Sequence, residues 1–325
     1  MSILKTGVNR MDNFIEYKKV CEKLLQNDRY TVACPICNKF NEDRSVFIQV
    51  YGFEYVQCRE CKHVYIDLLP EKGKHNDQSR FVSERMSKQL YQNKNINSYR
   101  IENVAKPKVD FVLEHFPEKF TGRWLDVGCG TGEMLYIVKE NNWVVQGIDN
   151  DSASLKFAKD VYGLDVLSGS VAEVNNDFFC QYDVISIFLL LEHIRNAKEI
   201  FKKICDGSDK GTKIVLEINN AESFSTLIQR DFSEYIDRHF LPCSHLNMFT
   251  HESLVYLMDI VNCKIISEWW FGQDFYELLV ILNYVNEGLK NLATYETLIE
   301  MTNSFQGVID KQEKSDRLIC IVEKM

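Results

Sequence analysis

The chain has 325 residues, 45% of them hydrophobic, and carries a formal net charge of -9 at pH 7. This length and apolar content predict one large domain with an appendage, and the acidic balance disfavours a nucleic-acid partner, because binding a long polyanion draws on clustered Lys and Arg. No signal peptide opens the chain and no apolar run reaches about 18 residues, so we expect a cytoplasmic protein with no membrane span and a small or uncharged substrate.

The first predicted element is an amphipathic helix over residues 10–27, where apolar side chains recur at helical spacing. Two Cys-x-x-Cys pairs then flank a β-rich segment, with 20 residues between them: Cys34 with Cys37, and Cys58 with Cys61. Four thiolates at this spacing suit one tetrahedral zinc ion, and so small a hairpin cannot bury enough apolar surface without a metal. We therefore predict a structural zinc ribbon, with four reduced core cysteines as the alternative.

The stretch from residue 71 to residue 80 is polar and charged, which is typical of a linker or loop. Residues 81–116 are helix-like and rich in Tyr, Asn, Lys and Glu. We expect this segment to cap the cleft of the domain that follows.

A glycine-rich turn opens that domain. The apolar run 123–127 contains Asp126, and a helical pattern begins at Glu133; between them stand three alternate glycines, Gly128, Gly130 and Gly132. Glycines allow positive φ and let backbone amides approach a ligand closely. A dinucleotide fingerprint would need its third glycine at the position of Glu133, and Asp126 favours a cationic ligand, so the pattern points to S-adenosylmethionine.

A second acid supports the same cofactor. Asp149 closes the next apolar run, 143–148, and lies where a carboxylate can accept both ribose hydroxyls. Asn150, which follows it, is also expected to contact the cofactor.

Beyond the glycine turn, apolar runs alternate with helical patterns, which is typical of a doubly wound parallel sheet. Strands are expected at 124–127, 144–148, 166–167, 184–189, 213–218, 263–271 and 317–324. Helices are expected at 133–140, 152–162, 197–204 and 251–260, with an irregular connection at 219–249. The segment 272–316 is an insertion with two helical patterns, which we interpret as a substrate lid or as an arm that would make the protein a homodimer.

The motifs Leu125–Gly132, Gly147–Asp149 and Tyr182–Ile194 together resemble the class I S-adenosylmethionine-dependent methyltransferases over about residues 120–270. The resemblance implies an α/β fold with a Rossmann-like, doubly wound, seven-stranded sheet. The domains are then a helix at 1–30, the zinc ribbon at 31–70, a helical linker and cap at 71–119, and the methyltransferase domain at 120–325. The resemblance adds further cofactor contacts: Ser170 and Val171 near adenine, Leu189 after the fourth strand, and Tyr99 or Arg100 from the cap.

Glu192 and His193 follow the fourth strand. In the related quinone O-methyltransferases, the equivalent pair and an acid three residues earlier hold a divalent metal, but here that earlier position is Leu189. The pair is thus predicted either to act in the active site or to cap a helix and anchor the strand end.

His245 precedes the helix that begins near Thr250. Its segment is similar to a His-x-x-x-Phe-Ser/Thr element of sugar C-methyltransferases that also carry a zinc ribbon, where this His serves as base. A neutral imidazole near pH 7 suits proton removal. Substrate hydrogen bonding and a purely structural role are the alternatives for His245.

The sequence therefore predicts a methyltransferase that acts on a small molecule, such as a nucleotide-linked sugar or a related biosynthetic intermediate. An RNA methyltransferase is the second hypothesis, since a ribosomal guanine methyltransferase class also joins a zinc module to this core. A scaffold that binds S-adenosylmethionine without catalysis is the third.

Overall fold

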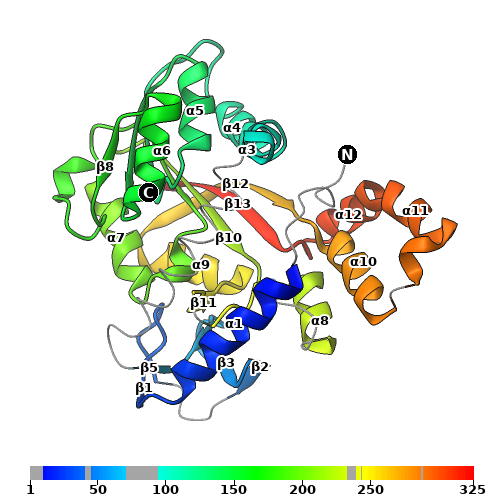
Figure 1. Cartoon of the computed structure of the whole chain (residues 1–325). Helices are drawn as coiled ribbons and strands as arrows, with labels where there is room; N and C mark the ends of the chain where they lie inside the picture. Colours follow the sequence, from blue (N-terminus) through cyan, green and yellow to red (C-terminus); the bar gives the residue numbers. More distant parts are fainter. Residues whose placement is uncertain (1–9, 41–44, 71–93, 233–238, 243, 287) are drawn as a thin grey trace.

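The computed structural model describes residues 10–40, 45–70, 94–232, 239–242, 244–286 and 288–325. Its centre is a seven-stranded sheet in the order β12-β13-β10-β9-β6-β7-β8 (Figure 1). Only β13 runs antiparallel to its neighbours. The predicted α/β methyltransferase fold is confirmed, with strands β6 (Arg123–Val127), β7 (Val144–Asp149), β8 (Val166–Ser168), β9 (Val184–Phe188), β10 (Lys213–Asn219), β12 (Cys263–Phe271) and β13 (Arg317–Lys324).

Helices cover both faces of this sheet, and each face has its own apolar cluster. The cluster on one face includes α4 (Lys106–Leu113), α5 (Glu133–Glu140) and α6 (Ser152–Tyr162). The cluster on the other face includes α7 (Ala197–Gly207) and α9 (His251–Ile260) (Figure 1). The core therefore lies in two layers, one on each side of the sheet.

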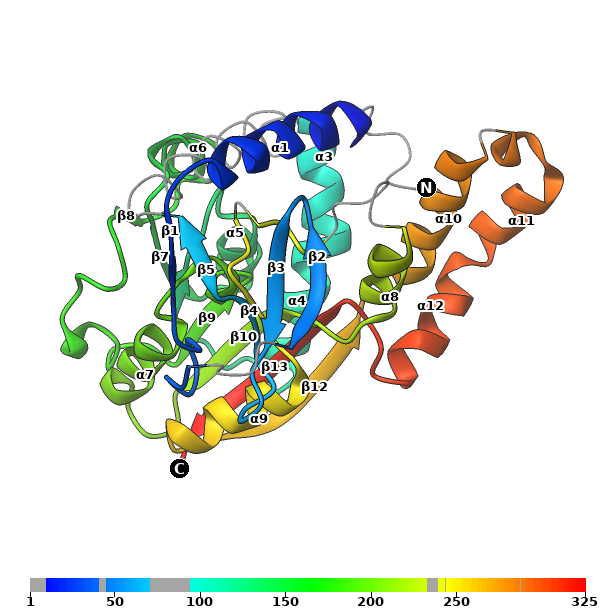
Figure 2. The same ribbon diagram turned by 90° about the horizontal axis from the view of Figure 1, so that it is seen from below.

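A continuous helical segment forms the described part of the cap. It joins α3 (Lys94–Arg100), a π-helical turn (Ile101–Ala105) and α4, which follow one another in Figure 2. Pro107 has no N–H to donate. Lys106 N donates to Ile101 O, five residues earlier, so this turn of the helix holds one more residue than an α-helical turn. The predicted linker at 71–80 and the first part of the predicted cap, 81–93, lie outside the described residues.

The cysteine ribbon packs beneath the large sheet. Helix α1 (Arg10–Leu25) lies across it, and its apolar residues join the ribbon's cluster (Figure 2). The ribbon's sheet has the order β11-β4-β3-β2, where β11 comes from the far half of the chain. The strands are β2 (Val46–Val50), β3 (Phe53–Gln57), β4 (Val64–Ile66) and β11 (Asn247–Met248), and β1 (Arg29–Thr31) pairs separately with β5 (Leu68–Pro70).

One sequence expectation needs correction: the connection 219–249, expected to be irregular, contains α8 (Phe224–Asp231) and β11. The insertion, expected to hold two helical patterns, contains α10 (Asp274–Val285), a short 3-10 turn (Leu289–Asn291), α11 (Ala293–Glu300) and α12 (Thr302–Lys311). Only Met301 separates α11 from α12, so a single helical pattern spans both.

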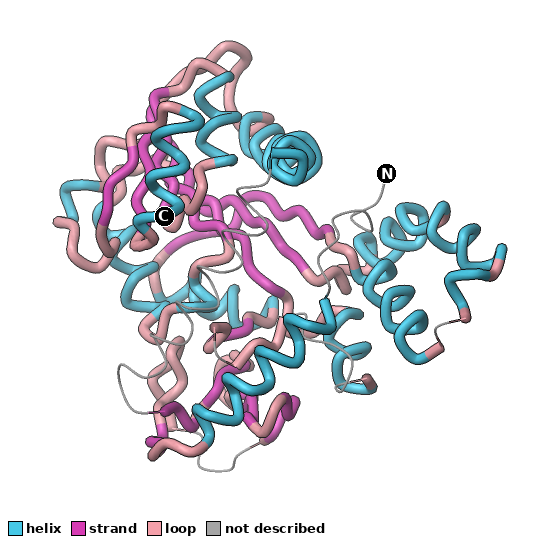
Figure 3. The backbone as a smooth tube through the Cα atoms, viewed as in Figure 1, coloured by secondary structure: helices cyan, strands magenta, loops and turns pink. Residues whose placement is uncertain are grey.

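The insertion lies at one end of the large sheet, beside α8, and extends away from the rest of the protein (Figure 3). Within the described ranges, no helix combines the length and the apolar character that crossing a membrane requires. Short 3-10 turns at Asn176–Phe178 and Leu191–His193 complete the secondary structure.

Candidate functional site

The glycine turn after β6 adopts the conformation that its sequence predicts. Gly128, Gly130 and Gly132 have φ of 80°, 51° and 82°. A Cβ on Gly132 would lie 2.4 Å from Leu164 Cδ1, whereas a Cβ on Gly130 would meet nothing within 4 Å. The third glycine therefore serves packing, and the middle one leaves the turn open on the side where a ligand can approach.

Asp149 at the end of β7 lies directly against this turn. Its Oδ2 accepts a hydrogen bond from Gly130 N at 2.8 Å, and its Oδ1 accepts one from Asp151 N at 2.8 Å. An ionised carboxylate has about four acceptor sites, so capacity remains for ribose hydroxyls. The neighbouring Asn150 is exposed.

Asp126 is a buried acid on β6. Ser186 Oγ donates to its Oδ1 at 2.6 Å. Burial raises the pKa of this carboxyl to about 7, while the Ser186 hydrogen bond and the charge of Lys108 act in the opposite direction. A ligand with a positive charge would favour the ionised form, so the site is chemically suited to a sulfonium and an ammonium group.

The other predicted cofactor residues lie around the same sheet edge. Ser170 accepts from Ala172 N through its Oγ at 3.2 Å, and Val171 is buried in the core. Leu189 has φ of 51° and donates its N–H to Glu217 O. Their roles as cofactor contacts stay predictions.

Of the two cap candidates, Arg100 contacts the residue that follows the glycine turn. Its Nε and Nη2 donate to the carboxylate of Glu133, the first residue of α5, at 3.0 and 2.8 Å. Tyr99 is half-buried, and its carbonyl accepts from Asn103 Nδ2. A bidentate pair of this kind fixes the cap helix against the turn.

Glu192 and His193 lie just beyond β9 and have different surroundings. Glu192 is fully buried. Its Oε1 accepts a hydrogen bond from the backbone N–H of Asn219, the last residue of β10, at 2.9 Å. Burial raises the pKa of the Glu192 carboxyl to about 7. His193 keeps accessible surface, and its Nδ1–H donates to Ser244 O at 2.8 Å.

The structure brings His245 against His193, with the ring centroids 4.8 Å apart in an edge-to-face arrangement. His245 Nδ1 lies 2.5 Å from His239 O. Since a carbonyl only accepts, Nδ1 carries the hydrogen in both rings and each Nε2 keeps its lone pair. Desolvation lowers the pKa of both imidazoles. The pKa of His245 is lowered well below its ordinary value, because the neighbouring His193 adds to the effect of desolvation.

The cysteine ribbon and the turn after β9 hold the His245 segment from two sides. Tyr55 on β3 donates its hydroxyl to His245 O at 2.7 Å. Leu246 N donates to Glu192 O at 2.7 Å, and β11 pairs with β4 immediately afterwards. The position of His245 therefore depends on a module far away in sequence.

Sequence reasoning missed a buried charge cluster on the α4 face of the sheet. Lys108 Nζ lies 2.6 Å from Glu217 Oε2, and Arg317 Nη1 lies 3.7 Å from Glu217 Oε1. The rings of Phe188 and Phe271 flank Lys108 at 5.8 and 5.7 Å. An acid inside the apolar run of β10 is the signal that could have revealed this cluster.

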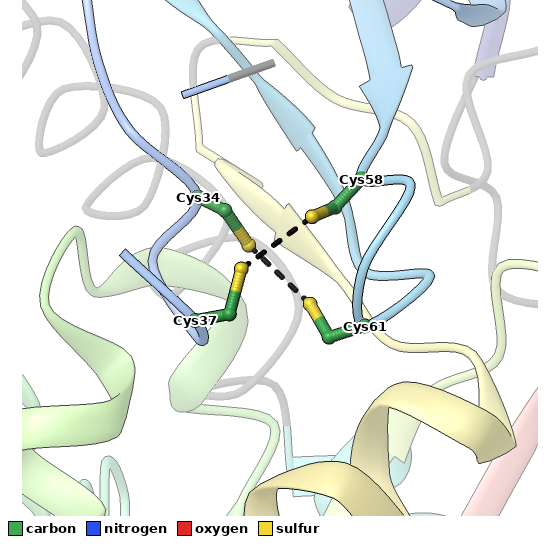
Figure 4. Close-up of side chains that lie close together, drawn as sticks. All are labelled: Cys34, Cys37, Cys58 and Cys61. Atoms are coloured by element: carbon green, nitrogen blue, oxygen red, sulfur yellow. Dashed lines mark hydrogen bonds between the residues drawn. The ribbon is translucent and has the colours of Figure 1, made fainter. Parts of the chain in front are cut away.

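The four ribbon cysteines converge on one point (Figure 4). The Sγ atoms of Cys34 and Cys61 are 3.5 Å apart, as are those of Cys37 and Cys58, and all four lie within 4.8 Å of one another. Tetrahedral zinc with Zn–S bonds of about 2.3 Å places sulfurs about 3.8 Å apart, so the donor set fits zinc. Within the described part of the chain, this is the one group of three or more side chains that could hold a metal.

Comparisons with known proteins agree with this geometry. The profile of a family described as a methyltransferase domain matches residues 96–268, more than half of the chain. The ubiquinone biosynthesis O-methyltransferase of Erwinia tasmaniensis is 26% identical over 143 residues, 42% of this chain and 59% of that protein. The putative methyltransferase 235L of Invertebrate iridescent virus 6 is 31% identical over 117 residues, 33% of this chain and 43% of that protein.

These alignments span about half the length of the relatives. Among solved structures, the magnesium protoporphyrin IX methyltransferase of Synechocystis PCC 6803, determined with bound SAH, shares the fold with a TM-score of 0.51. That likeness covers 78% of this chain and all of the other, at 12% identity. The glycine turn, the two acids and the matched domain of the present chain together show that it belongs to the class I S-adenosylmethionine-dependent methyltransferases.

Proposed function

We propose that the protein transfers a methyl group to a small hydroxylated acceptor, such as a nucleotide-linked sugar or a related biosynthetic intermediate. The observation that carries this proposal is the pair of neutral imidazoles, His193 and His245, beside the end of β9. S-adenosylmethionine, when bound, supplies an electrophilic methyl group. The chain's own residues must bind the cofactor, orient the acceptor and take up its proton.

The binding residues are those of the glycine turn and its acids. Gly130 offers an open approach to backbone amides, and Asp149 has acceptor capacity for ribose hydroxyls. Asp126 offers a carboxyl whose ionised form a cation favours. These three residues fit the cofactor by size, by hydrogen bonding and by charge.

His245 is the base of this proposal. Its Nδ1–H is held by His239 O, so Nε2 is left as the acceptor of the proton that leaves the substrate. The lowered pKa keeps the ring neutral, and therefore able to accept a proton, throughout the neutral pH range. His193, held in the same tautomer by Ser244 O, packs edge-on against it.

The test is a His245→Gln variant assayed with isotope-labelled S-adenosylmethionine and a metabolite extract, with methylated products detected by mass spectrometry. We expect turnover to fall by about 100-fold or more, the usual effect of losing a general base, while S-adenosylhomocysteine affinity stays unchanged.

The matched control is His115→Gln. His115 also directs Nδ1 at a backbone carbonyl, Phe111 O at 2.9 Å, but lies just beyond the end of α4. This control should keep full activity. Full activity of His245→Gln would dispose of the proposed base.

A further inference from the structure

Three buried polar atoms near the carboxyl ends of β9 and β10 have no hydrogen-bond partner among the described residues: Glu192 Oε2, Asn219 Oδ1 and Arg317 Nη1. Glu192 is 0% exposed, Asn219 is 1% exposed and the Arg317 side chain is 23% exposed. Buried polar atoms in folded proteins nearly always have a partner. Three such atoms in neighbouring side chains therefore indicate that something absent from the chain satisfies them.

Backbone pairing places the three side chains next to one another. Asn219 N donates to Glu192 Oε1 at 2.9 Å, and Asn219 faces Arg317 across the β10–β13 ladder. Alternate residues of a strand share a face, so Asn219 lies on the same face as Glu217, which contacts Lys108 of α4. Arg317 contacts Glu217 as well and so faces the same way.

This face continues toward the cofactor residues. In the sheet, β9 alone separates β10 from β6, the strand that carries Asp126. Glu192 belongs to the turn that also holds His245 in place, because Leu246 N donates to its carbonyl. Glu192, and through it Asn219 and Arg317, is thus connected to the residue that follows the proposed base.

The chemistry of the three atoms restricts the ligand. Two of them are oxygens that accept hydrogen bonds, and one is a guanidinium nitrogen that donates. A carboxylate or phosphate would suit Arg317 but would face the oxygens of Glu192 and Asn219. An ammonium group would suit the oxygens but would lie beside the cations Arg317 and Lys108.

A hydroxyl group both donates and accepts, and two neighbouring hydroxyls can satisfy all three atoms at once. Rotation of the Asn219 amide would present Nδ2 instead, and a hydroxyl can accept from that group equally well. The charges around the three atoms also favour a neutral ligand. Glu217 partly neutralises Lys108 and Arg317, so the site binds neither anions nor cations strongly.

The geometry points to a hydroxyl-binding subsite for the methyl acceptor, formed by Glu192, Asn219 and Arg317, whose ligand is a neutral polyol such as a sugar ring. This inference rests on the proposed methyltransferase function and names the substrate chemistry of that same site. The subsite would orient the ring so that one further hydroxyl or carbon faces His245 Nε2.

The test is saturation-transfer difference NMR on the full chain saturated with S-adenosylhomocysteine. The neutral probes are the methyl α-glycosides of glucose, mannose and galactose at millimolar concentration, and the charged probes are benzoate and benzylamine. We expect transfer to at least one glycoside. We also expect its apparent affinity to fall about fivefold or more in Asn219→Ala and in Arg317→Lys, since each loses one hydrogen bond of about 1 kcal/mol.

The control is Arg123→Lys, because Arg123 is the exposed first residue of β6 and donates a hydrogen bond to Gln181 Oε1. S-adenosylhomocysteine affinity checks that each variant is folded. Should either variant not fold, Glu192→Gln replaces it, because the amide keeps an oxygen for Asn219 N.

Transfer to benzoate alone or to benzylamine alone would overturn the inference, as would glycoside binding that no subsite variant weakens. No transfer to any glycoside, with S-adenosylhomocysteine bound, would mean that water satisfies the three atoms and would overturn it too. Failure of S-adenosylhomocysteine itself to bind would instead contradict the proposed function.

Discussion

Asp126 couples the cofactor site to pH. Its folded-state pKa of about 7 lies above the ordinary value of 3.8, so the stability it contributes is complete below about pH 4 and is lost as the pH rises through 7. Burial shifts the pKa of Glu192 to about 7 and that of Asp274 to about 6 in the same direction. Without cofactor, the protein should therefore lose stability between about pH 4 and about pH 7.

The corresponding prediction concerns Asp126→Asn, whose amide oxygen can still accept from Ser186. The variant cannot ionise at this position, so its free energy of unfolding should fall less than that of the wild type over this pH range. Urea denaturation at about pH 4.5 and about pH 7 measures the difference. An identical pH dependence for the two proteins would contradict the role of burial at Asp126.

Gly147 and Gly307 provide a pair of substitutions with opposite expected signs. An alanine Cβ at Gly147 would lie 2.6 Å from Cys129 Sγ, at the back of the glycine turn, whereas one at Gly307 in α12 would meet nothing within 4 Å. We expect Gly147→Ala to destabilise the fold by about 1 to 3 kcal/mol through overpacking. Gly307→Ala should stabilise it by up to about 1 kcal/mol through helix propensity. Thermal unfolding of both variants measures these changes in stability. An unchanged melting temperature for Gly147→Ala would contradict the packing argument.

At the scale of elements, the ribbon positions the proposed base. Tyr55→Phe removes the hydroxyl that donates to His245 O and keeps the ring that packs against Phe240. We expect kcat to fall about tenfold, because a small displacement of a catalytic group is costly, while cofactor affinity stays the same. Steady-state kinetics with the identified acceptor provide the measurement.

The control for this experiment lies on the same ribbon. Tyr65 is buried, and its hydroxyl has no hydrogen-bond partner in the part of the chain that the structure describes. Tyr65→Phe should therefore leave kcat unchanged. Equal effects of the two variants would show that ribbon packing in general, and not the bond to His245, affects activity.

Element boundaries could be predicted where the chain carries local signals. Helix α6 has its predicted ends because Asp151 caps its first turn and Gly163 adopts φ of 58° at its end. The ladder between β4 and β11 could not be predicted, because Asn247 and Met248 form a two-residue strand whose partner lies far away in sequence. Helix α8 was not predicted, although Ser223 caps its first turn.

The same distinction applies to the site. Motifs indicated the candidate acids and glycines of the cofactor site and the pair Glu192–His193, because these residues lie in or soon after predicted strands. Asn219 and Arg317 carry no motif, and only the antiparallel return of β13 brings them together. The tautomers of the two histidines likewise depend on carbonyls supplied by other segments.

For the whole molecule, zinc should link folding of the ribbon to turnover. The apolar clusters of both the ribbon and the large domain include residues from the segment around His245, among them Leu246, Met248 and Phe249. We expect one zinc per chain by elemental analysis. Chelation should abolish turnover and lower the melting temperature while S-adenosylhomocysteine still binds, because the glycine turn lies outside the ribbon. Unchanged turnover in the metal-free protein would contradict this account.

The central claim is that the turn from Gly128 to Gly132, with Asp149 beside it, binds S-adenosylmethionine. Isothermal titration calorimetry with S-adenosylhomocysteine, on the wild type, Asp149→Ala and the exposed control Asp165→Ala, tests this claim most directly. We predict one binding event per wild-type chain. The affinity of Asp149→Ala should be weaker by about tenfold or more, since charge-assisted hydrogen bonds to the ribose are lost. Its zinc content should be unchanged, and Asp165→Ala should bind like the wild type. No binding by the wild type, or unaltered affinity in Asp149→Ala, would contradict it.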